Sequence, residues 1–206
     1  MNKIGLGDEQ PTQVYLIRHG EVELPRQQRY NGHSDVALSP VGLHQLEALA
    51  ERLAPEPIRA VYSSDLIRSR TGAEAIARRF GLAVDSRFDL REKNFGRWEG
   101  LTAHEVSERF PDEWRLWVTH PADCRPQGGE SYRDAYGRVS GELGRILSRH
   151  PSQKIVVVGH GGVNRLILAY ALKLDLACIH RIEQQYAALN IIDFYETSAV
   201  AKLVNG

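Results

Sequence analysis

The chain has 206 residues, of which 42% are hydrophobic and 25% charged, so it is long enough to bury the core of one domain. Lysine plus arginine and aspartate plus glutamate number 26 each, which leaves a formal net charge of zero. Because no overall field favours nucleic acid or an anionic membrane, neither is expected as a partner, and any anion site must be built locally.

The N-terminal residues and the two cysteines indicate the compartment. Residues 1–13 have neither the basic nor the apolar part of a signal peptide, and no apolar run approaches the ~20 residues of a transmembrane helix. Cys124 and Cys178 lie far apart without metal-ligand spacing, so two reduced cysteines are expected. We therefore expect a cytoplasmic protein, and the sequence leaves a homodimer open.

The first predicted strand, residues 13–17, is a short apolar segment rich in β-branched and aromatic side chains. It leads directly into Arg18, His19 and Gly20, which places the two side chains at the carboxyl edge of a sheet. Open α/β sheets bind their ligands at this edge. The polar residues 23–37 have no clean period and predict a loop over it.

A helix and a second strand follow this loop. Ser39 is predicted as the N-cap of a helix that has Pro40 in its first position and extends to Ala54. Two prolines shortly beyond Ala54 end this helix. Residues 59–64 then predict the second strand, again short and apolar.

The next helix is expected to bring a further cation to the same edge. Asp65 is predicted as its N-cap and Gly81 as its C-terminal stop. Arg68 then lies in the first turn, where its side chain and the backbone N–H groups can face an anion beyond the second strand. Residues 82–84 predict a short edge strand.

Residues 90–130 form the irregular part of the chain. Segments 102–110 and 111–117 look helical, and several prolines separate them from the rest. Three tryptophans in this part either line a substrate pocket or pack the cap: Trp98, Trp114 and Trp117. We expect a small cap inserted at roughly 93–130 into a single domain that spans residues 1–206.

The strongest strand of the sequence lies in its last third. Ser131 opens a helix with 3.6-residue apolar spacing, and residues 155–158 then form a continuous apolar run that implies burial on both faces. This run stops at Gly159, His160 and Gly161, where another helix begins. The pattern of strand, histidine, glycine and helix therefore occurs twice in the chain.

Residues 189–195 and 199–204 are the last predicted strands. Strands that alternate with helices along most of the chain are typical of α/β proteins. We therefore predict a three-layer α/β/α sandwich with a mostly parallel central sheet.

Four donor groups are expected to converge at one edge of this sheet: Arg18, His19, Arg68 and His160. Such groups repel one another and are costly to desolvate unless they bind an anion. A phosphate dianion fits them best, because arginine binds its oxygens bidentately and helix N-termini add N–H donors. A metal is not expected, since the arginines oppose a dication and the histidines lack ligand spacing. The remaining histidines, His180 among them, have no predicted partners.

Residues 16–21, which contain Arg18-His19-Gly20, resemble the RHG signature of the histidine phosphatase superfamily, in its phosphoglycerate mutase-like branch. Five further segments resemble the same family in order and spacing: residues 32–42, 62–71, 90–100, 128–131 and 158–162. The match covers nearly the whole chain, and six segments in register are highly specific.

The resemblance implies a role for each residue that matches the family pattern. His19 would be the nucleophile that becomes phosphohistidine, and Glu92 the acid that protonates the leaving group and later activates water. The phosphoryl oxygens would be bound by Arg18, Arg68 and His160. Further substrate contacts are expected from Asn31, Gly32 and Gly161. The reaction would be metal-independent and use no cofactor, and the partner would be a small-molecule phosphate ester.

Two departures from the mutases favour a phosphatase. The mutases resembled have an asparagine six residues after the nucleophile, where this chain has Pro25, and an adjacent arginine pair that is absent between Gly96 and Gly128. The short form of the chain, with its block at residues 92–100 and its ending at residues 189–194, is similar to α-ribazole phosphatases of cobalamin biosynthesis, although broader relatives share that ending.

Three hypotheses follow from the sequence. The first is a phosphomonoesterase that acts on a small phosphorylated metabolite, with α-ribazole 5′-phosphate as one candidate substrate. The second is a phosphoglycerate mutase, and the third is a non-catalytic phosphate-binding or scaffold protein. Glu92 argues against the third, because a protein that only binds phosphate has no need of an acid.

Overall fold

The computed structural model describes residues 10–23 and 28–206, so Pro25 and the residues before Gln10 lie outside the described part. Six strands form one sheet in the order β3-β2-β4-β1-β5-β6. Their bounds are Thr12–Arg18 (β1), Ile58–Ser63 (β2), Val84–Ser86 (β3), Lys154–Gly159 (β4), Leu189–Phe194 (β5) and Ala199–Leu203 (β6). Of these described strands only β5 runs against the others, which confirms a mostly parallel sheet.

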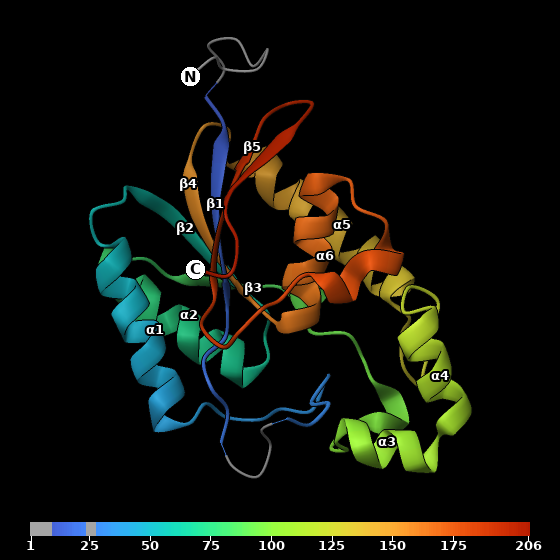
Figure 1. Ribbon diagram of the computed structural model, residues 1–206. Coiled ribbons are helices and arrows are strands. Elements are labelled where there is room, and N and C mark those ends of the chain that lie inside the picture. The colour runs from blue at the N-terminus through green and yellow to red at the C-terminus, as the bar shows by residue number, and fades with distance from the viewer. Residues whose placement is uncertain (1–9, 24–27) are drawn as a thin grey trace.

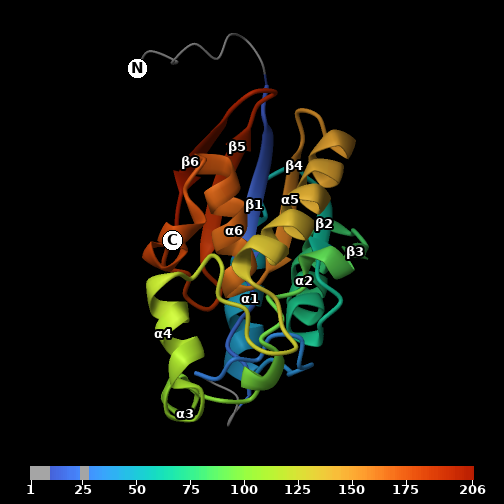
Figure 2. The ribbon, with the colours of Figure 1, turned by 90° about the vertical axis from the view of Figure 1, so that its right-hand side faces the viewer.

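Helices cover both faces of this sheet (Figures 1 and 2). Helices α1 (Pro40–Leu53) and α2 (Ile67–Phe80) lie on one face, and α5 (Tyr132–Arg149) and α6 (Gly161–Leu172) on the other. Side chains of a strand alternate between the faces, so Leu16 of β1 joins the core under α5 and α6, whereas Ile17 joins the core under α1 and α2. The three-layer α/β/α sandwich is therefore confirmed.

Strand β1 occupies the centre of the sheet. It pairs in parallel with β4 on one side and antiparallel with β5 on the other. Arg18, the last residue of β1, lies opposite Gly159, the last residue of β4. The residues that follow each strand, His19 and His160, consequently leave the sheet side by side at its carboxyl edge.

The segment predicted as a cap lies below the α5 and α6 side of the sheet, as Figure 1 shows. Its helices are α3 (Ala103–Arg109) and α4 (Pro111–Thr119), and short 3₁₀ turns at Phe88–Leu90 and Gly96–Trp98 lead into them. Thr102 and Glu105 form a reciprocal capping box at the start of α3, because each side chain bonds the other's backbone N–H. Both helical segments predicted here are therefore confirmed.

One predicted helix N-cap is wrong, and the predicted edge strand is shifted along the chain. The N-cap of α2 is Leu66, because the Asp65 carboxylate instead accepts two hydrogen bonds of 2.7 Å from Arg91. At the other end of α2, Gly81 adopts the left-handed conformation as predicted. The Leu82 N–H then bonds the Ala77 carbonyl, so Leu82 still belongs to the helix end and the edge strand begins only at Val84.

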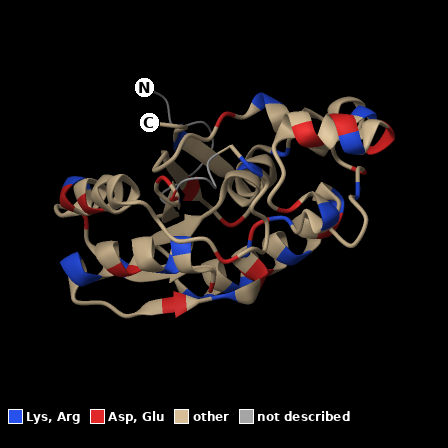
Figure 3. Cartoon of the chain, turned by 90° about the horizontal axis from the view of Figure 1, so that it is seen from below, with Lys and Arg blue, Asp and Glu red and all other residues tan. Residues whose placement is uncertain are grey.

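Charges of both signs are mixed on the side of the molecule on which β1 ends (Figure 3). Seen from the side on which β1 ends, acidic and basic residues alternate along the helices (Figure 3). Within the described residues, no three His, Cys, Asp or Glu side chains cluster so as to hold a metal ion, and no helix is both long and apolar enough to cross a membrane. Cys124 and Cys178 are free thiols.

Candidate active site

The carboxyl edge of β1 and β4 borders a cavity of about 410 Å³. Seven of the eight residues predicted for the site line it: Arg18, His19, Asn31, Gly32, Arg68, Glu92 and Gly161. The eighth, His160, lies against the first histidine, with 5.3 Å between the ring centroids. Segments far apart in the sequence thus bring the predicted groups to one place.

The His19 ring is held in one orientation by the backbone. Its Nδ1 lies 2.8 Å from the Gly20 carbonyl, which can only accept, so the ring proton belongs on Nδ1. The Nε2 lone pair is therefore available. Burial, with Arg68 and Arg18 nearby, lowers the pKa of His19 well below its usual value, and the ring is neutral near pH 7. A neutral imidazole with an unprotonated Nε2 is the form that can attack phosphorus.

In His160 it is Nε2, and not Nδ1, that has a hydrogen-bond partner in the described structure. Its Nε2 lies 2.7 Å from the Ser64 hydroxyl, whose oxygen also accepts the Leu66 N–H at 3.3 Å. Donation from the Ser64 hydroxyl to Nε2 would leave the ring proton of His160 on Nδ1. That Nδ1 is buried and has no hydrogen-bond partner among the described residues. Burial lowers the pKa of His160 as well, so this ring is also neutral near pH 7.

Arg18 is fixed from two directions. It donates a 2.6 Å hydrogen bond to the Gln184 carbonyl, and its guanidinium stacks 4.2 Å from the centre of the Tyr186 ring. Within the described chain its buried Nε–H has no acceptor. Although burial lowers its pKa, an arginine remains charged at neutral pH. The chain thus leaves a charged donor here for a ligand.

Arg68 is held by the loop that crosses the site. It donates to the carbonyls of Gly32 and Ser34 at 2.7 and 2.8 Å, and its buried Nε–H has no partner in the described structure. Burial lowers its pKa to about 10, which still leaves it charged at neutral pH. Glu99 holds the loop in turn, since it accepts from the His33 N–H and the Ser34 hydroxyl. Gly32, which was predicted to contact substrate, anchors Arg68 through its carbonyl and lines the cavity.

The Glu92 carboxylate lies over the first turn of α6. It accepts hydrogen bonds from the N–H groups of Gly162 at 2.9 Å and Val163 at 3.2 Å, and from the N–H of Lys93 at 2.9 Å. A helix N-terminus attracts negative charge, so it fixes this side chain at the rim of the cavity. Some of the N–H groups that we expected to face phosphate therefore hold the acid instead.

Lys93 is the least expected neighbour of the site. Its side chain is fully buried, and its Nζ has no hydrogen-bond acceptor in the described part of the chain. The Nζ lies 4.7, 5.0 and 5.5 Å from the ring centres of Phe95, Trp117 and Tyr132. Burial lowers the pKa of this lysine to about 8. The same three rings line the cavity, so a buried ammonium lies behind its wall.

The lining of the cavity also contains residues that the sequence analysis did not assign to the site. His180, for which no partner was expected, packs 4.7 Å from Trp117, and both line the cavity together with Arg165. Trp98 lies instead in the core. The sequence contains a signal that could have identified Arg165. It lies four residues after Gly161, and residues four apart share one face of a helix. No sequence signal could have identified Tyr186 or Ser64, because their contacts depend on distant segments.

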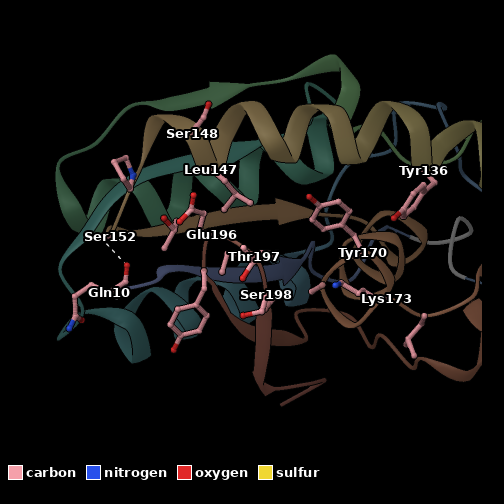
Figure 4. Close-up of a pocket in the computed structure, with 17 residues that line it drawn as sticks. Gln10, Tyr136, Leu147, Ser148, Ser152, Tyr170, Lys173, Glu196, Thr197 and Ser198 are labelled. Atoms are coloured by element: carbon pink, nitrogen blue, oxygen red, sulfur yellow. Dashed lines mark hydrogen bonds between the residues drawn. The ribbon is translucent and has the colours of Figure 1, made fainter. Parts of the chain in front are cut away.

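A second cavity of about 970 Å³ lies at the opposite edge of the sheet, between the ends of α5 and α6 and the turn that joins β5 to β6 (Figure 4). Tyr136, Tyr170 and Phe194 form its aromatic side, and hydroxyl groups such as that of Ser198 line the rest. Its described lining contains no histidine or arginine. None of the predicted site residues lies there.

The sequence and the structure are similar to known proteins over almost their whole length. The family model for the histidine phosphatase superfamily (branch 1) matches residues 14–206. A bifunctional protein of Mycobacterium tuberculosis is 38% identical over 197 residues, which are 95% of this chain and 54% of that relative, so this chain spans about half its length. Phosphoserine phosphatase 1 of Hydrogenobacter thermophilus is 34% identical over 194 residues, 94% of this chain and 92% of that enzyme.

Among solved structures, a putative α-ribazole-5′-P phosphatase from Escherichia coli aligns with a TM-score of 0.86. The alignment covers 95% of this chain and 97% of that chain, at 24% sequence identity. At this identity the similarity is one of fold.

Proposed function

The chain belongs to the histidine phosphatase superfamily, and on that premise we propose that it is a phosphomonoesterase that hydrolyses a small phosphorylated metabolite through a phosphohistidine. One observation carries the proposal. Around a single cavity lie two neutral histidines, one with a free Nε2 lone pair, and two arginines whose buried Nε–H groups have no partner among the described residues. This set of groups matches a phosphate dianion and supplies a nucleophile beside it.

In the first step the His19 Nε2 attacks phosphorus, and the bond from phosphorus to the ester oxygen breaks. Glu92 gives its proton to that oxygen, which leaves as an alcohol. Arg18, Arg68 and the Nδ1–H of His160 bind the three other phosphoryl oxygens as charge spreads over them. The products of this step are the alcohol and a phosphohistidine at His19.

In the second step water attacks the phosphorus of the phosphohistidine. Glu92, now a carboxylate, takes a proton from that water, and the P–N bond breaks to release inorganic phosphate. The His19 lone pair and the Glu92 proton are both restored, so the cycle closes. Two moderate displacements thereby replace one difficult displacement.

Residues 93–130 would act as the cap of a single domain and enclose the leaving group. Phe95 and Trp117 of this segment line the cavity, which supports that role. A phosphoglycerate mutase would use the same pocket but return the phosphoryl group to the substrate. The absence of an arginine pair from the cap argues against the mutase and favours water as the acceptor.

The phosphoenzyme is the direct test. Rapid quench with ³²P-labelled substrate should give a protein-bound label that is stable to alkali and labile to acid, as a phosphoramidate is. The label should be absent from His19→Ala and present in His160→Ala wherever turnover remains. A label on His160 would reverse the assignment, and release without any phosphoenzyme would contradict the mechanism.

A screen for phosphate release from phosphorylated metabolites, with α-ribazole 5′-phosphate included, would identify the substrate. Release measured with and without a bisphosphoglycerate primer separates the mutase from the phosphatase. A primer requirement for turnover would favour the mutase. Binding of phosphate without any turnover would favour a scaffold role.

A further inference from the structure

The loop formed by residues 184–188 lies against Arg18. The Gln184 carbonyl accepts a 2.6 Å hydrogen bond from an Nη of Arg18, and the Tyr186 ring centre lies 4.2 Å from the guanidinium carbon. The Ala188 carbonyl accepts the backbone N–H of Arg18 at 3.0 Å. These partners carry no charge, so they orient the guanidinium without neutralising it. The direction in which Arg18 presents its Nε–H therefore depends on where this loop stands.

The backbone of this loop is strained beside the nucleophile. Ala187 has a φ of 55°, in the left-handed region that is unfavourable for a residue with a Cβ. Its N–H donates a 3.1 Å hydrogen bond to the His19 carbonyl. A strained conformation persists only where the surrounding structure holds it. The loop therefore needs contacts with the rest of the fold to keep its shape.

The Gln184 side chain provides these contacts. It is buried and forms two reciprocal hydrogen bonds of 2.8 Å with the side-chain amide of Asn190 in β5. Asn190 in turn donates to the Leu16 carbonyl of β1 and accepts the N–H of Asn205, each at 3.0 Å. Because that carbonyl can only accept and that N–H can only donate, the amide of Asn190 has one orientation. Asn164 of α6 donates to the Gln184 side-chain oxygen at 3.4 Å, so the loop is tied to β1, β5 and α6.

Direction, rather than burial of apolar surface, is what this amide pair provides. Aliphatic side chains of similar size would fill the same space without any polar group to satisfy. A fully bonded pair of amides instead permits one arrangement of its two partners, which rigidifies the segment. Gln184 is not among the described residues that line the cavity, so an effect of its side chain on substrate must act through another residue.

We propose that Gln184 is a positioning residue: its amide, paired with Asn190, fixes the loop so that Arg18 presents its Nε–H to the phosphoryl group. This inference rests on the proposed phosphatase function. In the first step of that reaction the phosphoryl oxygens are bound by three donors, and each donor must already point at its oxygen when the charge develops. An Arg18 that is free to turn binds the dianion less well and stabilises the transition state less.

The first test removes the amide. Gln184→Met keeps a side chain of similar length, and we expect kcat/KM for p-nitrophenyl phosphate to fall by roughly 10- to 100-fold. Gln185→Met is the matched control, because it makes the same change at the next residue, whose side chain is exposed and bonds Glu183. The control should leave kcat/KM unchanged, and urea unfolding checks that both variants are folded in the assay. An unchanged kcat/KM in Gln184→Met would overturn the proposal.

Gln184→Glu tests the pairing without a change of size. A protonated carboxyl group can still form two reciprocal hydrogen bonds with Asn190, whereas a carboxylate has no proton to donate to the Asn190 oxygen. Burial disfavours the charged form, so this carboxyl group should ionise above about pH 4.3. The kcat/KM of the variant, divided by that of the unmodified protein, should be near one at acid pH and fall as pH rises. A ratio that stays constant with pH would overturn the proposal, and this variant replaces Gln184→Met if the latter does not fold.

The Nε–H groups of Arg18 and Arg68 report their positions directly. In ¹⁵N-labelled protein, saturating inorganic phosphate should shift the Nε–H resonances of both arginines, which Arg18→Lys and Arg68→Lys assign. In Gln184→Met the shift at Arg18 should be lost, while the shift at Arg68, which is held by Gly32 and Ser34, should remain. Shifts that are retained at both arginines, or lost equally at both, would overturn the proposal.

Failure of the phosphatase function gives a different result. Absence of p-nitrophenyl phosphate hydrolysis by the unmodified protein would count against that function alone, because the shifts caused by phosphate are measured without turnover. Absence of a shift at Arg18 in the unmodified protein would overturn the positioning role of Gln184.

Discussion

At the scale of single residues, the position of Glu92 makes a leaving-group test possible. Its carboxylate is anchored by backbone N–H groups of α6 and lines the same cavity as His19. If it protonates the leaving oxygen, its contribution should depend on how much that oxygen needs a proton. An alkoxide leaves poorly and a nitrophenolate leaves well without help.

We therefore expect Glu92→Gln to slow phosphoenzyme formation from an alkyl phosphate by roughly 10²–10⁴-fold. The loss for p-nitrophenyl phosphate should be far smaller. Single-turnover rates measured with both substrates decide the matter. Equal losses would mean that Glu92 positions the site and that another group donates the proton.

Lys93 should make stability depend on pH. Its pKa in the folded protein is about 8, against 10.5 for an ordinary lysine, because burial disfavours the ammonium. The unfolded chain therefore binds more protons between these values, and the destabilisation is fully present below about pH 8 and vanishes as pH approaches 10.5. The aromatic rings around Nζ offset part of it through cation–π attraction.

We expect Lys93→Met to raise the free energy of unfolding at pH 7 by up to about 3 kcal/mol. The gain should shrink steadily above pH 8 and be absent near pH 10.5. Urea unfolding at several pH values measures this difference, with Lys173→Met at an exposed lysine as the matched control. A gain that stays constant with pH would show that packing, and not charge, is the cause.

At the scale of elements, helix α1 supports the turn that carries His19. A Cβ on Gly42 would stand 2.6 Å from the Glu21 nitrogen and closer still to its carbonyl oxygen, both backbone atoms of that turn. Ser39 at the start of α1 reinforces the contact, because its N–H and its hydroxyl both bond Glu21. The helix and the turn therefore cannot separate or approach without a shift of His19.

Gly42→Ala should consequently destabilise the protein by about 1–3 kcal/mol and reduce activity, because the added methyl group overlaps backbone atoms. Gly144→Ala is the matched control, since it also lies within a helix but nothing lies within 4 Å of its added Cβ. That variant should gain about 0.5–1 kcal/mol and keep full activity. Thermal unfolding and steady-state rates check both variants, and a fully active Gly42→Ala would contradict the support role.

The elements differ in how well the sequence predicts them. The apolar runs of β1 and β4 and the cap residue Ser39 act locally, so these elements follow directly from the order of residues. The prediction of Asp65 as the N-cap of α2 was wrong because its carboxylate instead accepts hydrogen bonds from Arg91, 26 residues away. The 3₁₀ helix Leu176–Arg181 was not predicted, since six residues are too few to show a period.

The residues of the candidate site also differ in how well the sequence predicts them. His19 and His160 are predictable because each follows a buried strand, and the sheet fixes where such residues emerge. Glu92 has no local signal and depends on the family resemblance. The hydrogen bond between His160 and Ser64 could not be predicted, because the approach of Ser64 depends on how β2 and β4 pair.

At the scale of the whole molecule, the net charge of zero contrasts with the local excess of cations in the cavity. Under the proposed function, the chain itself would supply the positive charge that a metal ion supplies in metal-dependent phosphatases. We expect phosphate release to be unchanged in excess EDTA. Loss of activity that a divalent ion restores would contradict this, and the rate measured before and after chelation decides it.

The central position of β1 has a consequence for biosynthesis. Both sheet neighbours of this strand, β4 and β5, are encoded far downstream, and β4 begins about 140 residues after β1 does. At the usual rates of translation of about 5–20 residues per second, the buried strand β1 waits roughly 7–28 s for its first partner. During that interval β1 offers two unpaired edges, so the nascent chain has a greater need of chaperones than the finished fold suggests.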